Sequence, residues 1–192
     1  MTDNDNTPIR LLAVSGSLRS GSFCTTVLKS LQTGLPDGVE FDIFPLNDIP
    51  LYNQDIDSDE QRPAAVNDFK QAIADCDGLV VISPEYNYGI SGVLKNAIDW
   101  ASRPAMNSVL KGKPALVMTA SPAATGGVRA QSQVREVLAA CLARVVARPQ
   151  VVIAAVKDKV SDGRLTDEAA LSFSLAAIDD LIAEVRLLRR AA

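Results

Sequence analysis

The sequence predicts a single α/β domain in which a parallel sheet is covered by helices on both faces. Strand-like apolar runs alternate with helix-like segments five times along the 192 residues, which is the pattern of a doubly wound fold. The run at 78–82 is continuously apolar, as a buried central strand is, and the next strand is predicted at 114–119. A Ser- and Gly-rich loop after the first strand then favours a five-stranded sheet in the order 2-1-3-4-5.

The first half of the chain contributes two further strands and two helices. Residues 22–35 carry apolar positions at helical spacing, and residues 39–44 alternate as a half-exposed edge strand does. The predicted segments, in order, are a flexible tail at 1–8, a strand at 9–14, a helix at 22–35, a strand at 39–44, a long polar loop at 46–62 with an acidic and solvated run, and a helix at 63–75.

The second half continues the alternation without a repeat or a linker, so we expect one domain over 1–192. Helices are predicted at 91–102 and 128–143, and the last strand falls within 145–156. An amphipathic helix at 167–190 closes the fold.

The composition narrows the classes of function. The formal net charge of −4 argues against nucleic acid as a partner. No run approaches the length of a membrane span, about 18 apolar residues, so we expect a cytoplasmic protein. The absence of histidine excludes Ser-His and Cys-His catalysis and removes the commonest metal ligand. We expect no metal site or dithiol centre, because no C-x-x-C pair occurs among Cys24, Cys76 and Cys141.

Residues 15–22, Ser-Gly-Ser-Leu-Arg-Ser-Gly-Ser, lie between the first strand and the first helix. Free N–H groups and the helix dipole favour an anion at such a junction, and hydroxyls and a guanidinium add donors. The loop is neither G-x-x-x-x-G-K-[ST] nor G-x-G-x-x-G, and its size suits the single phosphomonoester of a mononucleotide. The alternative is that these serines only cap the helix.

Residues 84–89, Pro-Glu-Tyr-Asn-Tyr-Gly, follow the third predicted strand. Their aromatic rings, backbone amides and amide side chain suit the edge of a planar heteroaromatic ligand, although a structural turn is the alternative. A third loop, 120–127, follows the fourth strand. The carboxyl ends of parallel strands share one edge of the sheet, so one ligand can touch all three loops.

These stretches together resemble the NADPH-dependent FMN reductases, a family of flavodoxin-like proteins that includes quinone, azo and chromate reductases. The resemblance lies in residues 16–22, 84–89 and 94–100 and continues through 121–131, so it covers nearly the whole chain. It implies a flavodoxin-like three-layer sandwich that binds FMN.

The resemblance also implies an activity. FMN takes electrons from NADPH or NADH and passes them to a quinone or a similar small acceptor. The flavin carries the hydride chemistry, so no side chain is expected to be catalytic. Glu85 is open to two interpretations, a general acid or a backbone anchor. Two other functions stay open: a flavodoxin-like carrier of single electrons, and a domain that has lost FMN.

In the family the first loop holds the FMN phosphate, a role that falls here to Ser17, Arg19 and Ser22. The second loop lies along the isoalloxazine and the loop after the fourth strand flanks it. The family usually has Asn where this chain has Cys24, so a weak thiol donor replaces an amide near the phosphate. The residues expected to bind FMN are Ser17, Leu18, Arg19, Ser22, Phe23, Cys24, Pro84, Glu85, Tyr86, Asn87, Ala120 and Ser121.

The helix after the second loop leads us to expect a homodimer or homotetramer. Apolar groups beside an open cleft are costly to leave in water, and a two-fold interface covers them. The resemblance also implies dimers or tetramers, and we expect Tyr88 and Arg129 at or near the subunit boundary. The alternative is that the tryptophan packs into its own sheet. The apolar residues of this helix are Leu94, Ile98 and Trp100.

Overall fold

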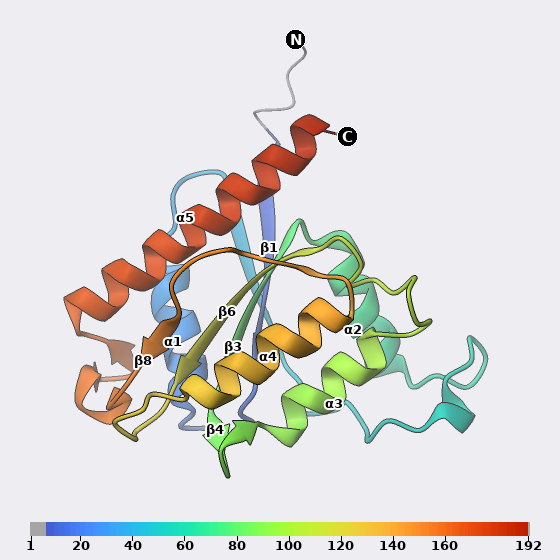
Figure 1. The fold of residues 1–192 in the computed structure, drawn as a ribbon, viewed down its shortest axis with the longest axis horizontal. Helices are drawn as coiled ribbons and strands as arrows, with labels where there is room; N and C mark the ends of the chain where they lie inside the picture. Colours follow the sequence, from blue (N-terminus) through green and yellow to red (C-terminus); the bar gives the residue numbers. More distant parts are fainter. Residues whose placement is uncertain (1–6, 192) are drawn as a thin grey trace.

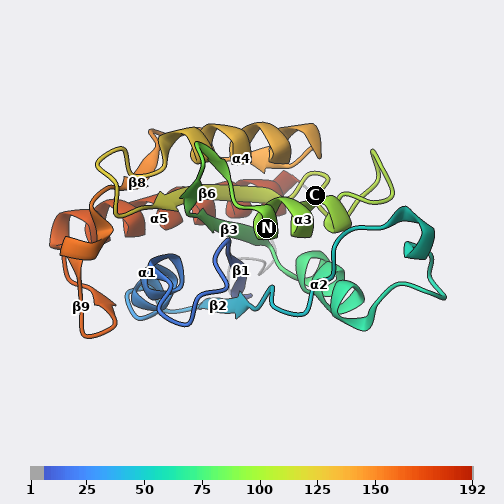
Figure 2. The same ribbon diagram turned by 90° about the horizontal axis from the view of Figure 1, so that it is seen from below.

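The computed structural model describes residues 7–191. Of the tail expected at 1–8, only Thr7 and Pro8 lie within the described residues. Their carbonyl oxygens accept hydrogen bonds from the Arg189 guanidinium, both at 2.9 Å. Figures 1 and 2 show a central sheet with helices on both faces.

The strands of this sheet are parallel, and the predicted order is confirmed. β1 lies between β2 and β3, β6 follows β3, and the fifth position beside β6 is filled by two short strands. The bounds are β1 (Ile9–Ser15), β2 (Val39–Phe44), β3 (Gly78–Ser83), β6 (Pro114–Ala120), β7 (Arg144–Val145) and β8 (Val151–Ile153).

The last predicted strand, 145–156, is interrupted. β7 pairs with the beginning of β6 and β8 with its end, and the chain leaves the sheet between them, where Pro149 supplies no N–H. The buried Gln131 compensates for this gap: its Nε2 donates to the Val151 carbonyl at 2.6 Å and to the Val117 carbonyl at 3.4 Å. The break therefore leaves both carbonyl groups with a partner.

Two apolar clusters hold the helices to the two faces of the sheet. α1 and α5 pack on one face, and α2, α3 and α4 on the other. Figure 2 shows α1 and α2 on opposite sides of β1 and β2. The helices begin and end within a few residues of the predicted bounds. They are α1 (Phe23–Gln32), α2 (Ala64–Asp75), α3 (Gly92–Ala101), α4 (Val128–Ala140) and α5 (Glu168–Ala191).

Short elements within the loops were not predicted. They are the 3-10 helices η1 (Gln54–Ile56) and η2 (Val156–Lys159), the hairpin β4 (Glu85–Tyr86) with β5 (Gly89–Ile90), and the hairpin β9 (Val160–Ser161) with β10 (Arg164–Leu165). Within residues 7–191, no helix combines the length and the apolar character needed to cross a membrane.

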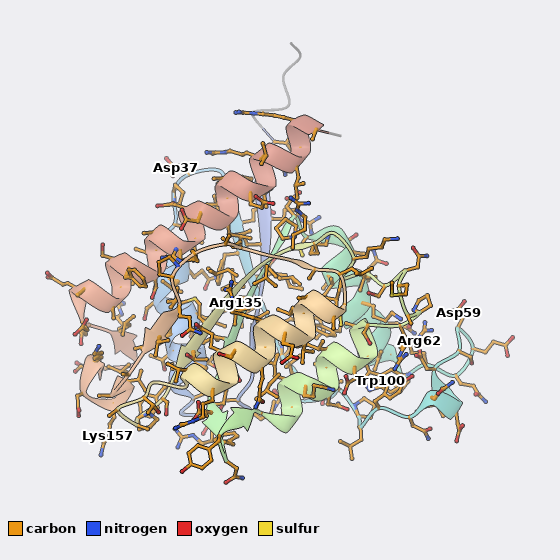
Figure 3. All side chains as sticks on the ribbon, in the orientation of Figure 1. Asp37, Asp59, Arg62, Trp100, Arg135 and Lys157 are labelled. Atoms are coloured by element: carbon orange, nitrogen blue, oxygen red, sulfur yellow. The ribbon has the colours of Figure 1, made fainter. Side chains whose placement is uncertain are left out.

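The long loop after β2 is more structured than its composition indicates. The Arg62 side chain binds Asp57 at 2.7 Å and Asp59 at 3.1 Å (Figure 3). The Asp57 side chain is only 6% exposed, so the expectation that the whole acidic run is solvated is wrong at this residue. Arg62 neutralises the charge that burial would otherwise penalise.

The expected apolar surface on α3 is also absent. Leu94, Ile98 and Trp100 are between 0% and 5% exposed within this one chain. Trp100 lies where α3 meets the loop after β2 (Figure 3), with its Nε1 donating to the Pro50 carbonyl at 2.8 Å and its ring edge-on to Tyr52. The prediction that these three residues need a two-fold interface to cover them is therefore wrong, because the chain covers them itself.

Candidate functional site

The carboxyl ends of β1, β3 and β6 surround a cavity of about 200 Å³. Ten of the twelve residues predicted to bind a cofactor line it, and Leu18 and Asn87 do not. Pro122 also lines it, although the sequence marked this residue only as part of the range 121–131 that carries the family resemblance. The lining residues are Ser17, Arg19, Ser22, Phe23, Cys24, Pro84, Glu85, Tyr86, Ala120, Ser121 and Pro122.

Gly16 lets the first two loops approach each other. Its N–H donates to the Ile82 carbonyl at 2.8 Å. A Cβ atom at this position would lie 2.8 Å from Ser91 Oγ and 3.1 Å from Pro84 Cδ. The close approach therefore requires glycine.

Hydroxyl groups hold the first loop, residues 15–22, against α1. Ser22 Oγ accepts a hydrogen bond from the Thr25 N–H at 3.2 Å and so caps the helix. Ser15 Oγ accepts bonds from the Ser17 N–H at 3.3 Å and from Thr25 Oγ1 at 3.1 Å. Among the described residues, none accepts a hydrogen bond from the Phe23 N–H. The helix N-terminus thus retains a donor for an anion, and the Ser22 hydroxyl can donate as well.

Arg19 lies over the same loop. Its Nη2 donates to the Gly21 carbonyl at 2.7 Å, and its guanidinium carbon lies 5.7 Å from the centre of the Phe23 ring. One guanidinium nitrogen is therefore occupied locally, and the others are free to bind an oxyanion at the cavity. The neighbouring Leu18 is 43% exposed and does not line the cavity.

Cys24 connects the first loop with the third. Its side chain is 2% exposed, and Sγ donates to the Ala120 carbonyl at 3.9 Å. Burial raises the pKa of the Cys24 thiol to about 12, and this effect exceeds the lowering by the hydrogen bond to Ala120. The thiol stays protonated at neutral pH and is not a nucleophile. Sequence reasoning did not identify this contact, since the two residues are 96 positions apart.

The second loop is the hairpin β4–β5. Asn87 and Tyr88 form its turn with φ angles of 50° and 65°, both in the left-handed region. Tyr86 is 52% exposed and lines the cavity, whereas Tyr88 is 71% exposed and lies beneath the Arg129 guanidinium, 4.5 Å away. Asn87 lies at the tip of the hairpin and not in the cavity wall.

Both carboxylate oxygens of Glu85 are occupied by α4. Oε2 accepts bonds from the N–H groups of Arg129 at 3.0 Å and Ala130 at 3.2 Å, and Oε1 accepts one from Arg129 Nη1 at 3.1 Å. Burial raises the pKa of Glu85, but these bonds outweigh it and hold the pKa below its usual value. Of the two interpretations, the geometry favours the ionised anchor over the general acid.

The third loop is held by the end of β8 and by the residues that follow it. The Ser121 N–H donates to the Ile153 carbonyl at 3.1 Å, and the Ser121 carbonyl accepts from the Val156 N–H at the same distance. Ser121 Oγ accepts from the Ala123 N–H at 3.2 Å. This loop therefore has a fixed backbone beside the cavity.

The three loops together provide two kinds of surface. Serine hydroxyls, a helix N-terminus and Arg19 offer donors for one phosphate, and Pro84, Tyr86 and Pro122 offer a flat and largely apolar wall. This combination fits a phosphorylated planar cofactor such as FMN. A larger hollow of about 380 Å³ lies between β2 and α2, and it contains none of the predicted residues.

Comparison with known proteins agrees with this fit. A family model for NADPH-dependent FMN reductases matches residues 9–158. An NAD(P)H-dependent FMN reductase of Pseudomonas aeruginosa is 38% identical over 182 residues, which cover 94% of this chain and 97% of the relative. A quinone reductase of Escherichia coli K12 is 36% identical over 185 residues, covering 93% and 98%.

A solved structure is also similar. FerB, a flavoenzyme NAD(P)H:(acceptor) oxidoreductase from Paracoccus denitrificans, superimposes with a TM-score of 0.77 at 31% identity. The match covers 93% of this chain and 97% of FerB.

Proposed function

This chain belongs to the NADPH-dependent FMN reductase family, and we propose that it holds FMN in the cavity at the ends of β1, β3 and β6. It is an FMN-dependent oxidoreductase with NAD(P)H as co-substrate. We propose quinones or similar small molecules as acceptors, because the Escherichia coli relative is named a quinone reductase. The main support for the FMN site is the cavity itself, because donors suited to a phosphate and ring side chains suited to a flavin line the same space.

Each loop has a distinct part in this proposal. Ser17, Arg19 and Ser22 hold the phosphate at the N-terminus of α1, and Phe23 and Cys24 close the cavity beneath it. Pro84, Glu85 and Tyr86 lie along the isoalloxazine, and Ala120 and Ser121 flank it. Leu18 and Asn87, which lie outside the cavity wall, are proposed only as neighbours of the cofactor.

Bound FMN supplies the hydride acceptor and donor, and the chain supplies binding, orientation and electrostatics. The titratable groups of the cavity support this division. Cys24 is held protonated, and Glu85 is ionised and accepts three hydrogen bonds from α4. Tyr86, half-exposed in the cavity wall, offers a flat face to a nicotinamide or quinone ring.

We also propose a cytoplasmic homodimer or homotetramer. The buried α3 residues do not support an interface, but the exposed rings of Tyr86 and Tyr88 on the hairpin do. They leave aromatic surface beside the cavity that a second subunit can cover. All three cysteines are free, as is usual in a reducing compartment. Light scattering at micromolar protein tests the assembly: a fully active monomer would refute it.

A visible spectrum of the purified protein, with NADPH oxidation across a panel of quinones, tests the function. We expect a yellow protein, or one that becomes yellow with added FMN, and quinone-dependent oxidation. A colourless protein even with FMN would exclude the proposed site. Accumulation of a long-lived one-electron-reduced form on dithionite titration, without NADPH oxidation, would favour the single-electron carrier.

A further inference from the structure

The hairpin β4–β5 supplies the missing cap of a helix that is distant in sequence. α4 begins after Gly127, which has no side chain to cap it. Glu85 Oε2 accepts hydrogen bonds from the N–H groups of Arg129 and Ala130, both in the first turn of α4. A carboxylate at this position satisfies two unpaired donors and complements the positive end of the helix dipole. Glu85 therefore caps α4 from 44 residues away in sequence.

The rest of the hairpin is bound to the same helix. Gln133 Oε1 accepts a hydrogen bond from the Ile90 N–H at 2.9 Å, and Gln133 Nε2 donates to the Tyr88 carbonyl at 3.4 Å. The Arg129 guanidinium pairs with Glu85 and covers the ring of Tyr88. Strand, turn and returning strand each contact α4 in this way.

The hairpin needs these contacts to keep its shape. Its strands are two residues long, too short to be stable alone. The turn places Asn87 and Tyr88 in the left-handed region, which costs free energy for any residue with a Cβ atom. The cost is greater for Tyr88, because it lacks the short polar side chain that helps Asn there. Support from outside the hairpin must offset that cost.

We propose that Glu85 is a positioning residue that fixes the flavin-facing wall of the cavity by capping α4, with Arg129 and Gln133 completing the attachment. The inference rests on the proposed function, since residues 84–86 line the proposed FMN cavity. Because the Glu85 carboxylate is bound to α4, it is not available to the cofactor. The hairpin then offers the cofactor its backbone and the Tyr86 ring. A wall that is fixed before binding lowers the ordering cost of holding the ring system.

The first test needs no flavin. In the FMN-free protein, Glu85→Ala should speed amide hydrogen exchange at Arg129, Ala130 and Ile90 by about tenfold relative to amides of β3. Glu136→Ala, which removes an exposed carboxylate from the same helix, should change none of these rates. Unchanged exchange in Glu85→Ala would overturn the attachment, whether or not the protein binds FMN.

The second test separates ring positioning from phosphate binding by comparing FMN with riboflavin in fluorescence titrations. Glu85→Ala should weaken both flavins by the same factor, about tenfold, because the phosphate loop stays intact. Arg19→Ala should weaken FMN alone. If Glu85→Ala does not fold, Glu85→Gln, which keeps the size and one acceptor oxygen, should give a smaller effect in the same direction.

The outcomes distinguish the two claims. Wild-type protein that binds FMN, with Glu85 variants that bind both flavins unchanged, would overturn the positioning role and leave the proposed function standing. A loss confined to FMN would also overturn it, since that places Glu85 with the phosphate. Wild-type protein that binds neither flavin would refute the proposed function and the positioning role together.

Discussion

The loop at residues 15–22, which we propose binds the FMN phosphate and call the phosphate loop, lines the same cavity as the hairpin β4–β5. The two are stabilised in different ways. In the phosphate loop, the side-chain hydrogen bonds join residues two to ten positions apart, such as Arg19 with Gly21 and Thr25 with Ser15. In the hairpin, the contacts with α4 join residues 43 to 45 positions apart.

This difference has a physical consequence. The side-chain hydrogen bonds of the phosphate loop lie within the loop and the first turn of α1, and the Gly16 N–H ties it to β3. The hairpin adopts its shape only when α4 is packed beside it. We therefore expect changes in the first region to act on phosphate binding and changes in the second to act on the ring wall.

The largest effect is expected for Arg19→Ala. Loss of a charged donor to the phosphate should weaken FMN binding by about 1.5–3 kcal/mol, the range for hydrogen bonds to charged groups. Riboflavin affinity should not change. Calorimetric titration of the apo-protein measures both, with Arg186→Ala, an exposed arginine on α5, as the control. An unchanged FMN dissociation constant would remove Arg19 from the phosphate site.

Gly16→Ala should disturb both regions at once. The new Cβ atom would lie 2.8 Å from Ser91 Oγ, which caps α3, and 3.1 Å from Pro84 beside the hairpin. Overpacking of this kind lowers the free energy of unfolding by about 1–3 kcal/mol. Gly21→Ala is the matched control, since a Cβ atom there meets nothing within 4 Å. Equal midpoints for the two variants in urea unfolding would contradict the close approach.

The same contrast explains which features the sequence predicted. The strand order and the place of the 15–22 loop between β1 and α1 depend on local periodicity and on a strand-to-helix junction, both visible within a few residues. The contacts of Glu85 with α4 and of Cys24 with Ala120 arise only when distant segments meet. No spacing in the sequence marks them.

Two wrong predictions have the same origin. The sequence predicts that the apolar residues of α3 need a partner subunit, but the loop after β2 folds back so that Pro50 and Tyr52 contact Trp100. The last strand was predicted as one element, whereas the buried Gln131 lets it divide into β7 and β8. In both cases a contact between distant residues decided the structure.

The pH dependence of the hairpin gives a smaller effect. The folded-state pKa of Glu85 is depressed, so its contribution to stability is fully present above the ordinary value of 4.5 and is lost as pH falls through the folded pKa. The difference in unfolding free energy between wild type and Glu85→Gln should therefore be constant from pH 7 to about 5 and shrink below it. A difference that grows on acidification would contradict the assigned ionised state.

The smallest effect is expected where the two kinds of contact meet, at Cys24. This residue belongs to the first turn of α1, yet its thiol bonds to Ala120, 96 positions away. In Cys24→Asn the amide N–H can donate to the same carbonyl more strongly than a thiol does. Cys24 lines the cavity, so the new amide oxygen can face the cavity and does not have to be buried without a donor. We expect stability and FMN affinity to change by less than about 1 kcal/mol, with FMN binding unchanged or tighter.

Cys76→Asn is the control: that buried thiol bonds to Ile73 away from the cavity, so the variant should lose stability without losing FMN affinity. A marked loss of FMN affinity in folded Cys24→Asn would show that the packing of the thiol supports the phosphate loop, which would then depend on a distant contact just as the hairpin does.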